Sequence, residues 1–174
     1  PQRGYTASAS SVYLTNPPWK AFDGDIADSH YHSTLSLYNS STGAYTGSNS
    51  LNGINGEWVI LQLPYKVDLS HVHIYPRLVS STAANQSADN ISIVGSNDGS
   101  SWTTLTSVTG LTYTDYTATV ITVNSSTGYK YFGFIGQKII AQPGNWTNWA
   151  LTQIELYGTQ ESTPVLARLG GAFE

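Results

Sequence analysis

The segment formed by residues 90–102, which reads NISIVGSNDGSSW, limits the fold of this chain more than any other stretch. Apolar and small polar side chains alternate through its first half, and that period of two is typical of a β-strand with one face in a core. The run Asn97-Asp98-Gly99 then predicts a tight turn, because glycine takes positive φ without a Cβ clash and aspartate hydrogen-bonds its own backbone. A β-hairpin is expected here, and the ring of Trp102, just after the turn, is large enough to close one end of a core.

Five further segments show the same alternation or an apolar run of strand length, and none repeats apolar residues at the spacing of a long amphipathic helix. These expected strands span residues 57–63, 67–75, 118–123, 129–135 and 151–157, and Pro64 is expected to end the first. Together with the hairpin they predict an all-β protein, an antiparallel β-sandwich of the eight-stranded jelly-roll type. A chain of 174 residues fits one domain over residues 1–158, followed by a tail or linker over residues 159–174.

Composition narrows the function classes. The formal net charge is −4, and only seven lysines and arginines are scattered along the chain, so no basic surface for nucleic acid is expected. No apolar run reaches the roughly 20 residues of a membrane span, and the absence of cysteine excludes disulfides and thiolate-bound zinc. The abundance of Ser, Thr, Asn and Gly is typical of an extracellular or particle-surface protein. Because it starts at Pro1 and has no methionine, the sequence is expected to be a processed product or a piece of a larger protein.

Three carboxylates lie within six residues of the segment WKAFDGDIAD, namely Asp23, Asp25 and Asp28. Neighbouring carboxylates repel each other unless a cation or several N–H donors lie among them. Their oxygens suit calcium, which takes about six to eight such ligands, although the spacing is not that of an EF-hand. The alternative is a solvated turn in which the aspartates cap backbone N–H groups.

The four histidines form two pairs, each separated by one residue. His71 and His73 are expected on the same face of a strand, whereas His30 and His32 lie in a long polar segment of residues 29–55. Because zinc needs three or four converging ligands, surface or sugar-contacting histidines are favoured over a zinc site. A polar segment of this length is usually functional or disordered, and its interleaved tyrosines favour a functional role.

The sequence carries no catalytic pattern. It lacks G-x-S-x-G, the P-loop, G-x-G-x-x-G and H-E-x-x-H, and its remaining acids lie mostly in expected strands and turns, where solvation explains them. The facing carboxylates of a glycosidase are therefore not indicated, and an enzyme is not expected. Aromatic rings are the better sign of function: Trp146 is expected to be exposed and able to stack on a ligand, whereas Trp149, next to the last strand, is expected to pack in the core.

Five motifs in order, KAFDGD, GEWVILQLP, VHIYPR, ISIVGSNDGSSW and ALTQIELYG, resemble the coagulation-factor type C or discoidin family. That group includes the family 32 carbohydrate-binding modules and other galactose-binding-like jelly rolls. The resemblance covers residues 1–158 and implies an eight-stranded jelly roll that binds ligands with loops at one end and often holds a structural calcium ion. Carried over by position, the calcium ligands would be the carbonyl groups of Lys20, Asp28 and Thr152 and the side chains of Asp23, Asp25 and Gln153.

Sugar-binding members of that group use an arginine at a strand end, an asparagine in the following loop, an early histidine and a late aromatic residue. The matching positions here are Arg77, Asn85, His30 or His32, and Trp146. Two departures from the family pattern predict a remodelled ligand surface: Tyr31-His32-Ser33 replaces the usual tryptophan after AFDG, and the early loop is longer than usual. Many relatives also have glutamate where this chain has Gln153, so calcium affinity is expected to be lower. On its residues alone, Arg77 could instead pair with a nearby acid.

The sequence therefore predicts a non-catalytic, lectin-like module of a larger surface protein that attaches to galactose-type or related glycans. Few groups are expected to be buried in the ligand contact, so each site should bind weakly and adhesion should rest on many copies. The alternative is a structural jelly roll of a virion, fibre or other surface assembly, in which the same loops contact protein neighbours or further copies of the chain. Membrane binding is not favoured, because the loops offer few exposed Leu, Phe or Met side chains.

Overall fold

The computed structural model describes residues 4–27, 29–77, 86–141 and 147–161 of the chain. Its strands are β1 (Thr6–Ala9), β2 (Tyr31–His32), β3 (Ser50–Leu51), β4 (Ile54–Asn55), β5 (Glu57–Pro76), β6 (Ala88–Ser96), β7 (Thr103–Val108), β8 (Thr119–Thr122), β9 (Tyr129–Ile139) and β10 (Ala150–Gln160). A single turn of 3₁₀-helix, η1 (Pro18–Ala21), follows β1. None of the described residues forms a helix that is long and apolar enough to cross a membrane.

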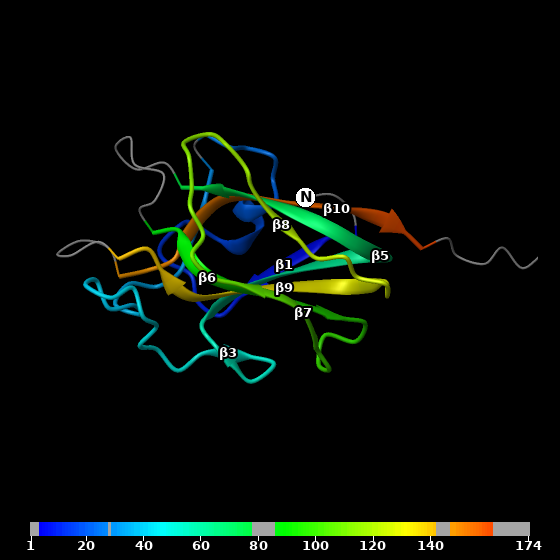
Figure 1. Ribbon diagram of the computed structural model, residues 1–174, viewed down its shortest axis with the longest axis horizontal. Coiled ribbons are helices and arrows are strands. Elements are labelled where there is room, and N and C mark those ends of the chain that lie inside the picture. Colours follow the sequence, from blue (N-terminus) through cyan, green and yellow to red (C-terminus); the bar gives the residue numbers. More distant parts are fainter. Residues whose placement is uncertain (1–3, 28, 78–85, 142–146, 162–174) are drawn as a thin grey trace, which may run out of the picture.

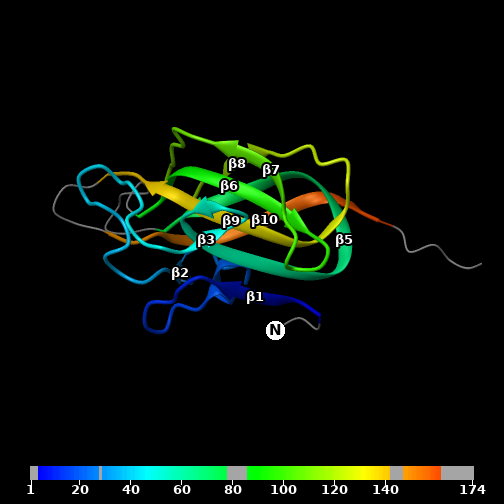
Figure 2. The same ribbon diagram turned by 90° about the horizontal axis from the view of Figure 1, so that it is seen from below.

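The strands form one large antiparallel sheet that folds over on itself (Figures 1 and 2). Its order is β2-β10-β5-β9-β6-β7, with β1 and β8 also paired to β5, and β3 and β4 form a separate hairpin. The first part of β5 pairs with β1 and β9, while its second part pairs with β8 and β10. Because β5 passes from one layer to the other, it joins the two halves of the core, and the predicted antiparallel jelly-roll sandwich is confirmed.

The expectation that Pro64 ends a strand is wrong, since β5 runs without a break for 20 residues. Proline has no N–H to donate to a neighbouring strand, so it is tolerated only where pairing is interrupted. In this strand the pairing with β9 is interrupted between Gln62 and Val67, and Pro64 lies within that gap. The strand therefore bends at the proline and continues into the second layer.

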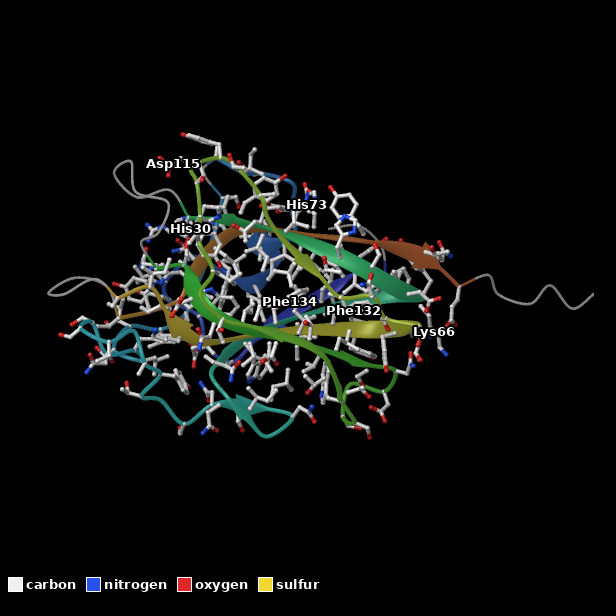
Figure 3. The ribbon with its side chains drawn as sticks, viewed as in Figure 1. His30, Lys66, His73, Asp115, Phe132 and Phe134 are labelled. Atoms are coloured by element: carbon white, nitrogen blue, oxygen red, sulfur yellow. The ribbon has the colours of Figure 1, made fainter. Side chains whose placement is uncertain are left out.

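The core lies between the two layers, where Phe132 and Phe134 of β9 are fully buried (Figure 3). Two tyrosines of the segment 29–55 belong to the same core, because Tyr31 and Tyr38 are 0% and 2% exposed. The Tyr38 hydroxyl donates a 2.6 Å hydrogen bond to the Gly136 carbonyl oxygen. The functional role that their spacing suggested is therefore wrong for these two tyrosines, which anchor the long polar segment to the sandwich.

Trp149 packs in the core as predicted, with 1% of its surface exposed. Its ring meets the edge of Tyr31 at a centroid distance of 5.9 Å. Gly136 of β9 leaves the space for it, because a Cβ at that position would lie 2.8 Å from the indole ring. The tryptophan thus fills the end of the sandwich at which β10 begins.

The predicted hairpin forms between β6 and β7, and Gly99 in its turn has φ +74°. The Asp98 carboxylate accepts the N–H groups of Ser100 and Ser101 at 2.8 and 2.7 Å, and these bonds hold its pKa below the ordinary value. Trp102 packs edge-on to Tyr131 at a centroid distance of 6.4 Å, at that end of the sandwich. The last strand, β10, runs to Gln160 and so continues two residues beyond residue 158, the expected end of the domain.

Candidate functional site

Four polar residues meet at one end of the sandwich, where several strands begin or end. His32 belongs to β2, Arg77 directly follows β5, Gln86 precedes β6 and Asn148 precedes β10. The backbone brings them together, because Ala150 of β10 pairs with His32 and donates its N–H to the Gln86 carbonyl oxygen at 3.0 Å. We call these four residues the end cluster.

A continuous chain of hydrogen bonds joins the end cluster. Nη1 of Arg77 donates to Oε1 of Gln86 at 2.5 Å, and Nε2 of Gln86 donates to Oδ1 of Asn148 at 2.9 Å. The same Gln86 nitrogen lies 3.0 Å from Nε2 of His32, which also accepts from Nδ2 of Asn148 at 2.8 Å. Nδ1 of His32 lies 2.9 Å from the Ser33 carbonyl oxygen. These partners assign the proton to Nδ1, because Nε2 faces two amide donors and a carbonyl oxygen can only accept.

The end cluster keeps His32 neutral at ordinary pH. Burial lowers the pKa of His32 to about 4, and the positive charge of Arg77 acts in the same direction, although the bond to Ser33 opposes it. Burial also lowers the pKa of Arg77 from its ordinary value, but a guanidinium retains its charge at any physiological pH. The end cluster therefore contains one permanently charged side chain, Arg77, and three uncharged polar side chains that are hydrogen-bonded to it or to one another.

Burial separates supporting residues from those that can reach a ligand. Gln86 and Asn148 are 0% exposed and His32 is 3% exposed, whereas Arg77 is only partly buried. Gln86 binds one nitrogen of the planar guanidinium and so restricts its orientation. A guanidinium presents several N–H donors in a rigid fork, and it suits ligands that offer neighbouring oxygen acceptors.

The structure brings some of the predicted sugar-binding residues together. His30 is half-buried beside His32, with 6.1 Å between the ring centroids, and both lie at the same end of the molecule as Arg77. Figure 3 places His30 toward the end of the sandwich that lies opposite Lys66. His32 itself lies beneath the surface and acts as a support for Gln86. Asn85 and Trp146 lie outside the described residues.

Sequence reasoning did not single out Gln86 or Asn148 as members of the site. In a chain this rich in asparagine, nothing local distinguishes a buried amide from an exposed one. One signal is visible only in the backbone, since Gln86 has φ +66°, in the left-handed region that non-glycine residues rarely adopt. That conformation points to a residue that is held in place by its surroundings.

We call the loop that carries Asp23 and Asp25 the carboxylate loop. It forms a turn in which the aspartates cap backbone N–H groups, which is one of the two interpretations of its sequence. Asp23 accepts the Asp25 N–H at 3.0 Å and the Ser29 hydroxyl at 2.5 Å, and Asp25 accepts the Ala27 N–H at 2.8 Å. The Gln153 side-chain oxygen also reaches this loop, where it accepts the Gly24 N–H at 3.1 Å. The Gln153 side-chain oxygen is therefore hydrogen-bonded to the loop that carries Asp23 and Asp25, and carboxylate and amide oxygens are donor types that suit calcium.

For the other calcium ligands that the family resemblance implied, the structure gives contacts of two side chains. Thr152 uses its hydroxyl to donate to the Pro76 carbonyl oxygen at 2.9 Å, and the Lys20 ammonium lies 3.4 Å from the Asn16 side-chain oxygen. Asp28 lies outside the described residues. Calcium therefore stays a prediction.

The other histidine pair lies on the outer face of β5, as predicted for residues two apart on a strand. His71 stacks on Tyr157 of β10 at a centroid distance of 4.7 Å, and His73 lies 3.5 Å from the Glu155 carboxylate. Within the described ranges, no three His, Cys, Asp or Glu side chains are grouped so that they could hold a metal ion. These histidines are thus packed among aromatic and acidic neighbours on a sheet surface.

No protein-family model matches the chain, and no curated protein is significantly similar to it in sequence. Solved structures do match. The module CBM32-3 of a family 31 glycoside hydrolase from Clostridium perfringens is 18% identical, with a TM-score of 0.67 over 90% of this chain and 92% of that one. The family 32 carbohydrate-binding module of C. perfringens NanJ, solved in complex with galactose, is 20% identical, with a TM-score of 0.61 over 90% and 95% of the two chains.

A third match is chitosan-binding module 1 of a chitosanase/glucanase from Paenibacillus sp. IK-5, which is 22% identical, with a TM-score of 0.62 over 89% of this chain and 96% of that one. The similarity is one of fold, since the sequence identities are low. The chain has the galactose-binding-like jelly-roll fold of the family 32 carbohydrate-binding modules, as the resemblance of its motifs implied.

Proposed function

We propose that this chain, which has the fold of family 32 carbohydrate-binding modules, is a non-catalytic glycan-binding module whose ligand is held at the end cluster. The observation that carries the proposal is the bond from Arg77 to Gln86, because it ties a partly exposed cation to a buried network of side-chain amides. Two solved structures of the same fold are described as bound to galactose and as chitosan-binding, respectively. Both ligands are sugars rich in hydroxyl groups.

The chemistry of Arg77 supports a sugar ligand. Vicinal hydroxyl oxygens accept two hydrogen bonds at the spacing that a guanidinium fork provides, and no charge on the ligand is required. Holding the guanidinium in advance lowers the entropy lost on binding. We assign galactose-type or related glycans as the ligand class, with His32, Gln86 and Asn148 as positioning residues.

A shallow contact of this kind binds each sugar weakly, so attachment to a glycan-covered surface would rest on several copies acting together. We therefore propose that the chain is one module of a larger extracellular or particle-surface protein. The same fold occurs within a family 89 glycoside hydrolase from C. perfringens, of which the match covers only 14%.

We also propose that the carboxylate loop binds a structural calcium ion through Asp23, Asp25 and Gln153. Calcium would bind several oxygens of one loop and tie it to β10, so the melting temperature would rise as the free calcium concentration exceeds the dissociation constant. Thermal unfolding with calcium and with EGTA tests this, with Asp23→Asn as the variant that removes one charged ligand. A melting temperature that is the same in calcium and in EGTA would exclude the ion.

A glycan array probed with the chain on a multivalent carrier tests the proposed function. We expect binding to a defined group of galactose-type or related glycans, and loss of that signal in Arg77→Ala. Lys66→Ala is the matched control, because it also removes one cation but lies at the other end of the sandwich, in contact with Glu161 (Figure 3). A folded protein that binds no glycan would refute the proposal and leave a structural or protein-binding role.

A further inference from the structure

A second polar surface lies beside the end cluster and is built by the long segment that follows β2. An open groove of about 650 Å³ runs between this segment and the ends of β6 and β9. It is lined by Ala44, Tyr45, Gly47, Gly53, Ile54, Asn55, Asn90, Gln137 and Lys138. Its volume falls within the range of about 300 to 1,000 Å³ that is usual for small-molecule sites.

The backbone holds the two walls of the groove together. Ala44 forms an isolated antiparallel bridge with Lys138 of β9, and the Ile139 N–H donates to the Gly43 carbonyl oxygen at 2.9 Å. Figures 1 and 2 show the segment that leads to β3 running beside this end of the sheet. The groove thus depends on the early loop, whose extra length the sequence already showed.

Side-chain amides dominate the polar lining. Within the described part of the chain, the Asn55 and Asn90 amides make no hydrogen bond to another group, and Gln137 uses only its oxygen, which accepts from the Ser92 hydroxyl at 2.7 Å. The Lys138 ammonium is paired with the Asp89 carboxylate at 2.5 Å, so its charge is compensated. Amides both donate and accept, as sugar hydroxyls do, and the paired charge favours a neutral saccharide.

The groove and the end cluster each take one residue from the segment around the start of β6. Gln86 and Asn90 are four residues apart where the chain enters β6, a distance of at most about 13 Å at 3.3 Å per residue. A short oligosaccharide is long enough to span a separation of this size.

We propose that this groove is an extension subsite, which binds further neutral sugar units of a glycan whose first unit is held at Arg77. The inference rests on the proposed function and adds to it that the ligand is an oligosaccharide. Asn55, Asn90 and Gln137 are the residues that contact the added units.

Isothermal titration with saccharides of increasing length tests the subsite. The probes are galactose with β-1,4-linked galactooligosaccharides of two to four units, and N-acetylglucosamine with the matching chitooligosaccharides. We expect the affinity for one of the two series to rise about tenfold with length, the gain from two hydrogen bonds of ordinary net strength. The double variant Asn55→Ala/Asn90→Ala should lose this gain and keep the affinity for the monosaccharide. The protein for these titrations is produced in bacteria, so that Asn90 carries no glycan although Asn90-Ile91-Ser92 is an N-glycosylation sequence.

Asn97→Ala is the matched control, since it removes an asparagine at the other end of β6, where the amide donates to the Gly128 carbonyl oxygen. NMR titration of the unmodified chain gives a readout that needs no variant: side-chain amide signals of Asn55, Asn90 and Gln137 should shift with the oligosaccharide and not with the monosaccharide. Binding that does not depend on length, or amide signals that do not move, would overturn the subsite alone. Failure of every saccharide to bind would overturn the proposed function and the subsite together.

Discussion

Acid should weaken this protein through His32, the buried histidine of the end cluster. In the folded chain its pKa is about 4, whereas an unfolded chain has the ordinary value of 6.5. Above pH 6.5 the imidazole is neutral in both states, so its contribution to stability is complete. As the pH falls from 6.5 toward 4, His32 binds a proton in the unfolded chain but not in the folded chain, so the free energy of unfolding decreases.

The size of the effect follows from the two pKa values. They predict a loss of about 2 kcal/mol between pH 7.5 and pH 5, and solvent screening at this end of the molecule reduces it to about 1 to 2 kcal/mol. Burial is the main cause, and the geometry acts in the same direction, because a proton on Nε2 would point at the amide donors of Gln86 and Asn148. Those amides would have to turn, and Gln86 would release Arg77.

Urea unfolding at pH 7.5, 6.0 and 5.0 measures this loss, with His32→Gln as the comparison because glutamine does not titrate. The other three histidines are present in both proteins, so their contributions cancel. We expect the unfolding free energy of the original chain to fall about 1 to 2 kcal/mol further than that of the variant. Equal losses in the two proteins would refute the assignment of a neutral, Nδ1-protonated His32.

Three further predictions concern the core and the glycan site. Trp149→Ala should lower the free energy of unfolding by about 3 to 5 kcal/mol in urea, since the ring is fully buried and leaves a cavity; a smaller loss than about 1 kcal/mol would contradict its role. Glu57→Gln should lower the free energy of unfolding in urea by about 3 kcal/mol. The buried carboxylate accepts hydrogen bonds from Ser10 at 2.8 Å, Tyr45 at 2.9 Å and Asn49 at 2.7 Å, and the nitrogen of the new amide would face these donors. An unchanged free energy of unfolding would disprove this. Glycan binding should stay constant between pH 6.5 and 5, where His32 of the folded chain remains neutral, and should weaken as the pH falls through about 4; an affinity in titration calorimetry that already falls between pH 6.5 and 5 would contradict this account of His32.

Most of the fold could be predicted from the sequence because sandwich strands leave a period of two. Residues 57–63 and 67–75 were found this way and lie within β5, whereas residues 129–135 were found as an apolar run of strand length and lie within β9. Pro64 misled the prediction, since the absence of its N–H matters only where a partner strand lies opposite, and pairing cannot be read from a single strand. Tyr31 and Tyr38 misled it for a related reason: their burial depends on β9 and β10, which lie about 100 residues away along the chain.

The candidate site was only partly visible. Arg77 followed from its place at a strand end and from the family resemblance, but its support did not. Gln86 and Asn148 lie 62 residues apart, and only the sandwich brings their amides within 2.9 Å. The groove beside Asn90 is equally non-local, because one wall comes from the long early loop and the other from β6 and β9.

An NMR titration of the isotope-labelled chain with galactose, and with N-acetylglucosamine as a second probe, tests the central claim most directly. The account predicts that signals of His32, Arg77, Gln86 and Asn148 shift with one of the two sugars, while those of His71 and Tyr157 on the outer sheet face do not. Shifts confined to that outer face, or no shift with either sugar in a folded sample, would contradict a glycan site at the end cluster.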